Sequence, residues 1–331
     1  METYPIGLND QESPSEALAI NGQAVSTEKP FITANTIESS LEEIRERHII
    51  PVFVKDNEPV ISQAEFIQTV YEVAHSMYPR ETILSPSVRL SHEIKGRVPE
   101  AKEKPAKSLL EHEKTIYYER MAFVIEIPSI QQEVGGNLLS LTVGGIKAYN
   151  LDNLYNKKGA DEHFKVFTGF QNKVCTNLCV WTDGYLSDLK VKNLGQLQVS
   201  VKQLIESYNA DNQLQALSRL SEYALTEQQF AHLIGRCRMY QHLPQAQKSS
   251  LTPLLLSDTQ LGAVVKDFYR DQSFCKDADG NINLWKLYNL FTGVNKSSYI
   301  DTFLDRNVSA FDFTLQLCEA LESNADNWYL P

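Results

Sequence analysis

The sequence predicts an α+β fold: a mainly antiparallel sheet in the N-terminal half, followed by a helical C-terminal half. Between about residues 49 and 193, apolar side chains recur at every second position and short turns separate the runs, which is the period of a β-strand. From Leu197 onward, apolar residues recur at every third or fourth position, as they do in helices that bury one face. Strands followed by helices along a chain are typical of α+β proteins.

We divide the 331 residues into three parts. Residues 1–35 are polar, contain scattered prolines and glycines, and show no apolar period, so we expect a disordered acidic tail. Residues 36–194 form the predicted sheet-rich α+β region, and residues 195–331 form a helical region packed on it. Nine acidic and three basic residues among the first 47 give more than half of the net charge of −11.

Local signals place the elements of the sheet region. We expect a short helix from Thr36, a strand at residues 49–54, and a longer helix that begins after Ser62. Ser62 and Glu65 have the spacing of a capping box, in which two side chains satisfy free backbone N–H groups at the start of a helix. Alternation with one strongly apolar face then predicts strands from residue 120 to 127 and at 139–143, and further strands follow at 164–170 and 174–181.

Further signals continue into the helical region. The strand at 139–143 ends in a glycine pair at 144–145, which indicates a bulge or the close approach of another backbone. Thr226 and Gln229 form a second capping box. Apolar stripes predict later helices at 261–268, 284–291 and 313–321, and the segment 241–253 is predicted to be a loop.

Composition and motifs limit the chemistry. Five cysteines, an odd number at wide spacing, predict reduced thiols. With no secretory signal and no apolar run near the ~20 residues of a membrane span, we expect a cytoplasmic protein without membrane contact. Cys175 and Cys179 lack the second pair of a zinc site, and the acidic turn at 277–281 lacks the ligands of a calcium loop. No nucleotide-binding or hydrolase motif is present, so we predict no metal and no cofactor.

The segment from Arg89 to Lys107 has the clearest charge pattern, with six bases against three acids. Cations neutralise phosphates while aromatic rings stack on bases, which is the combination that single-stranded nucleic acid requires. On one extended strand, Arg89, Lys95 and Arg97 would share a face. The candidate nucleic-acid-binding residues are Arg89, Lys95, Arg97, Lys102, Lys104, Lys107, Tyr117, Tyr118 and Arg120. The alternative interpretation is a solvated strand face and a charged loop.

Three segments resemble an uncharacterised, phage- or plasmid-related domain-of-unknown-function family of bacterial mobile elements. They are residues 89–97, residues 174–180 around Cys175-Thr176-Asn177, and residues 283–292 with a Leu-Trp-x-x-Tyr-Asn pattern. The resemblance spans roughly residues 40–330. It implies a role in DNA maintenance, recombination or evasion of host defence, and it brings no known reaction, ligand or catalytic residue.

We rank three functions. The first is a mobile-element accessory protein that binds single-stranded nucleic acid through the sheet and the basic segment. The second is a protein-interaction or anti-defence factor, in which the acidic tail and the helices bind a host protein. The third is an enzyme with an unrecognised site, which only the length of the chain favours.

Overall fold

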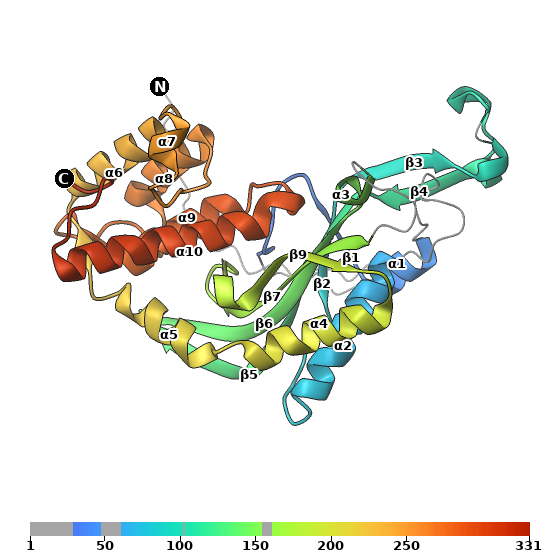
Figure 1. The fold of residues 1–331 in the computed structure, drawn as a ribbon, viewed down its shortest axis with the longest axis horizontal. Coiled ribbons are helices and arrows are strands. Elements are labelled where there is room, and N and C mark those ends of the chain that lie inside the picture. Colours follow the sequence, from blue (N-terminus) through green and yellow to red (C-terminus); the bar gives the residue numbers. More distant parts are fainter. Residues whose placement is uncertain (1–28, 48–60, 102, 154–160) are drawn as a thin grey trace, which may run out of the picture.

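The computed structural model describes residues 29–47, 61–101, 103–153 and 161–331. Its centre is a curled sheet with helices on both faces (Figure 1). In spatial order, the strands are β1 (Ile37–Ser39), β2 (Ser87–Leu90), β5 (Arg120–Val134), β6 (Asn137–Ala148), β7 (Glu162–Asn172) and β8 (Leu178–Cys179), with β9 (Tyr185–Val191) also on β7. Each of these pairings is antiparallel, so the predicted α+β class is confirmed.

The first face of the sheet packs against α2 (Gln63–Met77) and α4 (Leu194–Ser207), with α1 (Leu41–Arg47) and α5 (Ala210–Arg219) beside them. The ring of Phe66 in α2 lies 5.1 Å from that of Phe123 and 4.7 Å from that of Phe164, measured between centroids. The capping box of Ser62 and Glu65 starts α2 as predicted. This face therefore carries the apolar alternation that the sequence shows.

The second face is also buried, under α9 (Leu284–Asn295) and α10 (Ile300–Ser323). Ala122 and Val124 of β5 alternate with the residues that face α2, and they belong to a second core cluster with Phe303 and Leu304 of α10. The strongly apolar face predicted for β5 is confirmed by its buried side chains, and the opposite face of the strand is buried as well. Helices from the second half of the chain cover the face that we expected to be the less apolar one.

A lobe of helices adjoins α9 and α10 at one end of the molecule (Figure 1). It contains α6 (Glu227–Tyr240), α7 (Gln245–Lys248) and α8 (Asp258–Arg270). Thr226 and Gln229 form the predicted capping box of α6, and Ser257 and Gln260 form another at α8. The strands β10 (Ala224–Leu225) and β11 (Ile282–Asn283) pair just before α6 and α9. The helix α7 lies inside the segment that we predicted as a loop.

Several boundaries differ from the prediction. Ile37–Ser39 form β1 rather than helix, because they pair with β2, and the helix begins only at Leu41. The strand predicted at 174–181 is reduced to Leu178–Cys179. The strand predicted at 49–54 lies outside the described residues. The remaining short elements are α3 (Tyr149–Asn153) and 3-10 turns at Pro99–Ala101, Ala106–Ser108, Glu111–Glu113 and Thr182–Gly184.

The glycine pair at 144–145 serves close packing. A Cβ atom added at Gly144 would lie 2.3 Å from the carbonyl oxygen of Phe123, and one added at Gly145 would lie 2.6 Å from the Phe66 ring. The register between β5 and β6 is continuous through both glycines. Of the two expected explanations, close approach therefore applies and a bulge does not.

The last residues of the predicted tail are packed on the body. Phe31 and Ile32 are buried with 4% and 0% of their surface exposed, and the Phe31 ring lies 6.3 Å from that of Phe303. The backbone N–H of Thr33 donates to the carbonyl oxygen of Lys296 at 2.8 Å. Residues 29–35 therefore belong to the folded body, while residues 1–28 lie outside the described part of the chain.

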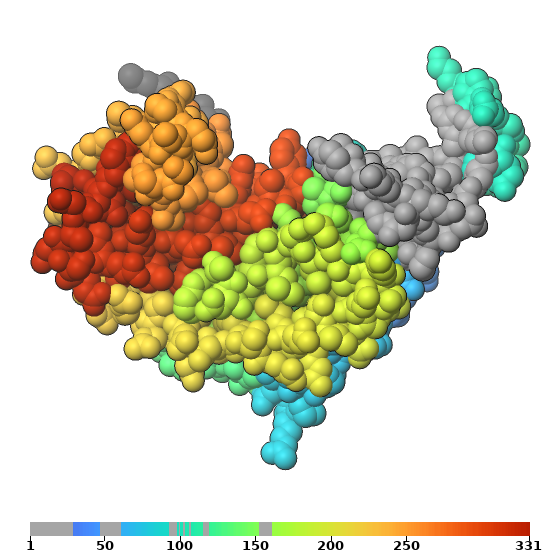
Figure 2. Space-filling model, in the orientation of Figure 1, coloured from blue at the N-terminus to red at the C-terminus, as the bar shows by residue number. Residues whose placement is uncertain are grey.

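A two-stranded arm projects from the end of the molecule opposite the helical lobe (Figure 1). It consists of β3 (Glu93–Arg97) and β4 (Lys114–Tyr118) with their connection, and it forms a sheet of its own. The surface is hollowed beside the lobe (Figure 2). The arm thus carries most of the basic segment away from the core.

Candidate anion-binding site

Two segments singled out in the sequence meet in space. The turn at residues 172–177, here called the junction turn, follows β7 and lies against α9. The Asn172 amide donates to Asn289 Oδ1 at 3.1 Å, and the Asn177 amide donates to the Asn289 carbonyl oxygen at 2.9 Å. All three asparagines are buried. A buried amide without a partner costs about 1–3 kcal/mol, so these bonds fix the turn on the helix.

The middle of the junction turn is held by charge and by the N-terminal segment. Thr176 has a left-handed backbone with φ of 56°, which is unfavourable for a β-branched residue. The Thr176 hydroxyl donates to the Lys29 carbonyl oxygen at 2.9 Å. The Lys296 ammonium donates to Thr176 Oγ1 at 2.8 Å and also to the Cys175 carbonyl oxygen. Lys296 and residue 29 therefore clamp the strained turn from two sides.

A cavity of about 430 Å³, here called the junction pocket, opens beside this clamp. The junction turn and α9 form one wall, and the C-terminal end of α8 with the residues after it forms the other. Its charged lining consists of four cations and two carboxylates: Lys29, Lys266, Arg270, Lys296, Asp267 and Asp271. The formal charge of the lining is therefore +2, which favours an anion.

The four cations have no carboxylate partner within the described residues. Fourteen other described Lys and Arg side chains form ion pairs. Asp271 directs its carboxylate to the backbone N–H groups of Ser273 and Phe274, at 2.8 and 2.7 Å. Burial, followed by the charge of Asp271, raises the pKa of Asp267, and the charge of Lys266 opposes this shift. The positive charge of the junction pocket is thus left largely unneutralised.

Lys296 is the most enclosed of the four. Burial lowers its pKa to about 8, against the opposing effect of Cys175, and the charge of Lys29 lowers it further. An ammonium group that lacks a counter-ion in a poorly hydrated site is destabilised in its charged form. An anion bound in the junction pocket would supply that counter-ion and stabilise the protonated amine.

The thiol of Cys175 also lines the junction pocket. Burial raises the pKa of this thiol, and the nearby Lys296 opposes the effect only in part. The reactive form of cysteine is the thiolate, so the neutral Cys175 side chain is a poor nucleophile. Among the described residues, no group of three or more His, Cys, Asp and Glu side chains could hold a metal ion.

Arg89 has a structural role in β2. Its guanidinium donates to Thr36 Oγ1 and to the Thr36 carbonyl oxygen at 2.9–3.1 Å, and lies 3.7 Å from the Glu38 carboxylate. The expectation that Arg89, Lys95 and Arg97 share one strand is wrong, because β2 ends at Leu90 and β3 belongs to another sheet. Arg89 also lines a second cavity of about 130 Å³, which shares Lys29 with the junction pocket.

The other candidate residues fall into three groups. Lys104 is paired with Glu113, and Arg120 lies 2.9 Å from Glu119 and 3.5 Å from Asp301. Lys107 is exposed on the connection of the arm. The remaining candidate side chains lie outside the described part of the structure: Lys95, Arg97, Lys102, Tyr117 and Tyr118.

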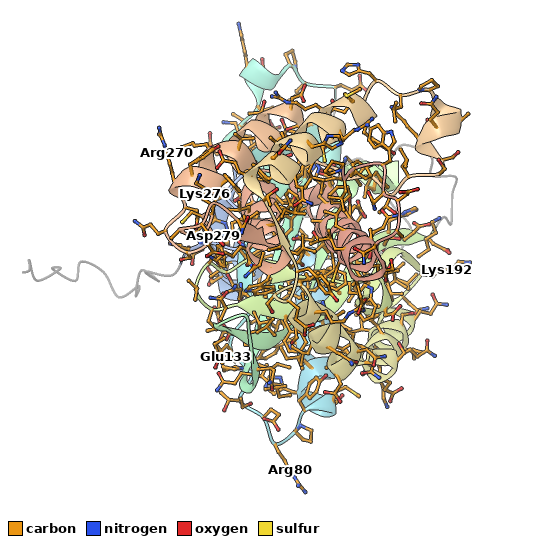
Figure 3. The ribbon with its side chains drawn as sticks, turned by 90° about the vertical axis from the view of Figure 1, so that its left-hand side faces the viewer. Arg80, Glu133, Lys192, Arg270, Lys276 and Asp279 are labelled. Carbon is orange, nitrogen blue, oxygen red and sulfur yellow. The ribbon has the colours of Figure 1, made fainter. Side chains whose placement is uncertain are left out.

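The junction pocket and the arm lie far apart. The helix α8, which supplies Lys266 and Arg270, belongs to the lobe at the opposite end from β3 and β4 (Figure 1). Arg270 lies on one side of the molecule, opposite Lys192 (Figure 3). The basic residues of the sequence are thus divided between two separate surfaces.

Sequence reasoning identified both segments of one wall of the junction pocket, but neither the other wall nor the cations. Cys175-Thr176-Asn177 and the pattern at 284–289 were singled out, yet no spacing related them. The four cations are scattered from position 29 to position 296, and none belongs to a basic run. A lysine directly after the patterned helix, as Lys296 is, was the one available signal.

The fold and the junction pocket define an α+β protein with a candidate anion site between the junction turn, α9 and α8. The sequence matches the family described as "Domain of unknown function, B. Theta Gene description (DUF3871)" over residues 15–330. The chain belongs to this family. No curated protein matches the chain, and no solved structure matches it. Within the described ranges, no helix combines the length and the apolar character needed to cross a bilayer.

Proposed function

We propose that this protein is an accessory protein of a phage- or plasmid-related mobile element and that it binds single-stranded nucleic acid. The observation that carries the proposal is the gathering of four cations without carboxylate partners around the junction pocket. The anionic groups of a nucleic acid are its phosphates. When lysine and arginine side chains neutralise them, counter-ions leave the strand, and this release contributes to the affinity.

The surroundings support a polymeric ligand. The second cavity shares Lys29 and extends from the junction turn toward Arg89, and Glu38 and Glu126 balance the charge of its two cations. The arm offers a separate basic segment at the other end of the molecule. A single strand is flexible enough to contact both surfaces, which distinguishes it from a stiff duplex.

A salt-dependent binding titration tests this function. We would measure the affinity for single- and double-stranded oligonucleotides with phosphorylated ends between 50 and 200 mM salt. Changing Lys266 and Arg270 together to alanine should weaken binding of the single strand. The slope of log affinity against log salt should flatten by about 1.4, which is ~0.7 for each lost phosphate contact. Lys190 and Lys192, changed together to alanine, form the matched control on the opposite side.

Two results contradict the proposal. If the wild-type protein does not bind oligonucleotides at 50 mM salt, a protein-interaction or anti-defence role replaces it, with a host protein as the partner. If both double variants lose the same affinity, the effect is one of net charge alone.

A further inference from the structure

We infer that the junction pocket binds a phosphomonoester, the terminal phosphate of a strand or the phosphate of a free nucleotide, rather than an internal phosphodiester. For the terminal phosphate of a strand, the inference rests on the proposed function. For the phosphate of a free nucleotide, it does not. Three observations support it: the charge of the lining, the size of the pocket, and the donors that remain free.

The charge of the lining fits a dianion. Four cations and two carboxylates leave +2. A phosphomonoester carries about −1.5 to −2 charges at pH 7, whereas each internal phosphodiester carries about −1. One internal phosphodiester in the pocket would leave a net charge of about +1, whereas one terminal phosphate would neutralise the lining almost completely.

The size of the junction pocket fits a single small ligand. Its volume of about 430 Å³ lies in the range of pockets that enclose small molecules, which is roughly 300–1,000 Å³. Lys296 and the junction turn close one side, and the segment from Lys266 to Phe274 closes another. A single phosphate group with its nucleotide fits in a space of this size.

The free donors also suit a terminal phosphate. The Lys296 ammonium has three N–H groups, of which two are directed to Cys175 O and Thr176 Oγ1. One N–H remains for a ligand. Arg270 is exposed at the end of α8, and a guanidinium can hold two oxygens of one phosphate. A terminal phosphate thus offers three oxygens to these two cations of the pocket lining.

Matched oligonucleotides distinguish the two sources of the phosphate. The probes are one single-stranded sequence with a 5′-phosphate, a 3′-phosphate or no terminal phosphate, together with adenosine monophosphate and inorganic phosphate. We expect one phosphorylated end to bind at least about 10-fold more tightly than the unphosphorylated strand, which corresponds to ~1.4 kcal/mol. Adenosine monophosphate should compete with that strand.

Two variants connect the effect to the junction pocket. Arg270→Gln should abolish the preference for the phosphorylated end while binding of the unphosphorylated strand persists. Lys296→Met should do the same, and thermal unfolding of both proteins checks that they fold. Arg270 is exposed, so its variant remains informative if Lys296→Met loosens the junction turn. Lys192→Gln, on the opposite side, should retain the full preference.

The possible outcomes separate the two proposals. Equal affinity for all three strands, without competition by adenosine monophosphate, overturns the inference and leaves nucleic-acid binding intact. Binding of adenosine monophosphate that requires Arg270, with no binding of any strand, overturns the proposed function and supports the free-nucleotide form of the inference. If no probe binds, both are wrong.

Discussion

At the scale of single residues, Lys296 connects stability to pH. Its native pKa of about 8 lies below the ~10.4 of an unfolded lysine. Below pH 8, Lys296 is protonated in both the folded and the unfolded protein, and the folded protein contains a poorly solvated charge. Between pH 8 and the pKa of the unfolded lysine, the unfolded protein binds more protons than the folded protein, so the free energy of unfolding rises with pH.

The comparison with Lys296→Met isolates this effect. Urea unfolding of both proteins at pH 7 and pH 10 should show that the wild type gains stability relative to the variant at the higher pH. The expected gain is up to about 1.4 kcal/mol for each unit by which the pKa is lowered. Tyrosines and other lysines are common to both proteins and cancel in the difference. A gap that is the same at both pH values would mean that Lys296 keeps an ordinary pKa.

At the scale of elements, α9 is the helix on which both the core and the junction pocket depend. Leu284, Leu287, Tyr288 and Phe291 are all buried to 0% exposure, so the face that the sequence predicted as a stripe is core. The Trp285 indole donates to Asn137 Oδ1 at 2.8 Å and covers the turn at Gly135. This places the helix over the end of the β5–β6 hairpin.

Leu287→Ala should therefore cost about 2–5 kcal/mol of unfolding free energy, because a buried leucine leaves a cavity in a close-packed core. Urea unfolding measures the change. Gln198→Ala, on the exposed side of α4, should stay within about 0.5 kcal/mol of the wild type. A cost below ~1 kcal/mol for Leu287→Ala would show that this face of α9 is not part of the stable core.

The arm allows a separate test of the basic segment. Lys95→Ala combined with Arg97→Ala should flatten the salt dependence of single-strand binding by about 1.4 if β3 contacts phosphates. The thermal midpoint should change little, because β3 and β4 form a sheet separate from the main one. Arg89 is kept in this variant, since its bonds to Thr36 hold β1 beside β2. An unchanged slope would exclude this strand of the arm from the binding surface.

At the scale of the whole molecule, the N-terminal segment 29–35 joins the junction turn to α10. Deleting residues 1–34 removes the buried Phe31 and Ile32, whereas deleting residues 1–28 keeps them. The longer deletion should lose at least about 3 kcal/mol relative to the shorter one, the usual cost of emptying a site for a large apolar side chain. Thermal and urea unfolding of the two proteins compare them directly. Equal stabilities would show that this segment contributes nothing to the fold.

The sequence by itself determined the features that depend on neighbours along the chain. Capping boxes at Ser62 and Thr226 were readable because their partners lie three residues away, and strand or helix periods repeat within one element. The order of strands followed by helices gave the α+β class. The close approach at the glycine pair was one of two explanations that the sequence allowed, and the neighbouring Phe66 decided between them.

Only the tertiary structure decided what lies together. Ile37–Ser39 form a strand although their local spacing predicted a helix, because their pairing with β2 outweighs the local preference. The tertiary structure separated Arg89 from the arm and brought Lys29, Lys266, Arg270 and Lys296 to one cavity. The physical reason is that a charged site is defined by distances across the fold, and Coulomb interactions depend on those distances and on burial rather than on sequence separation.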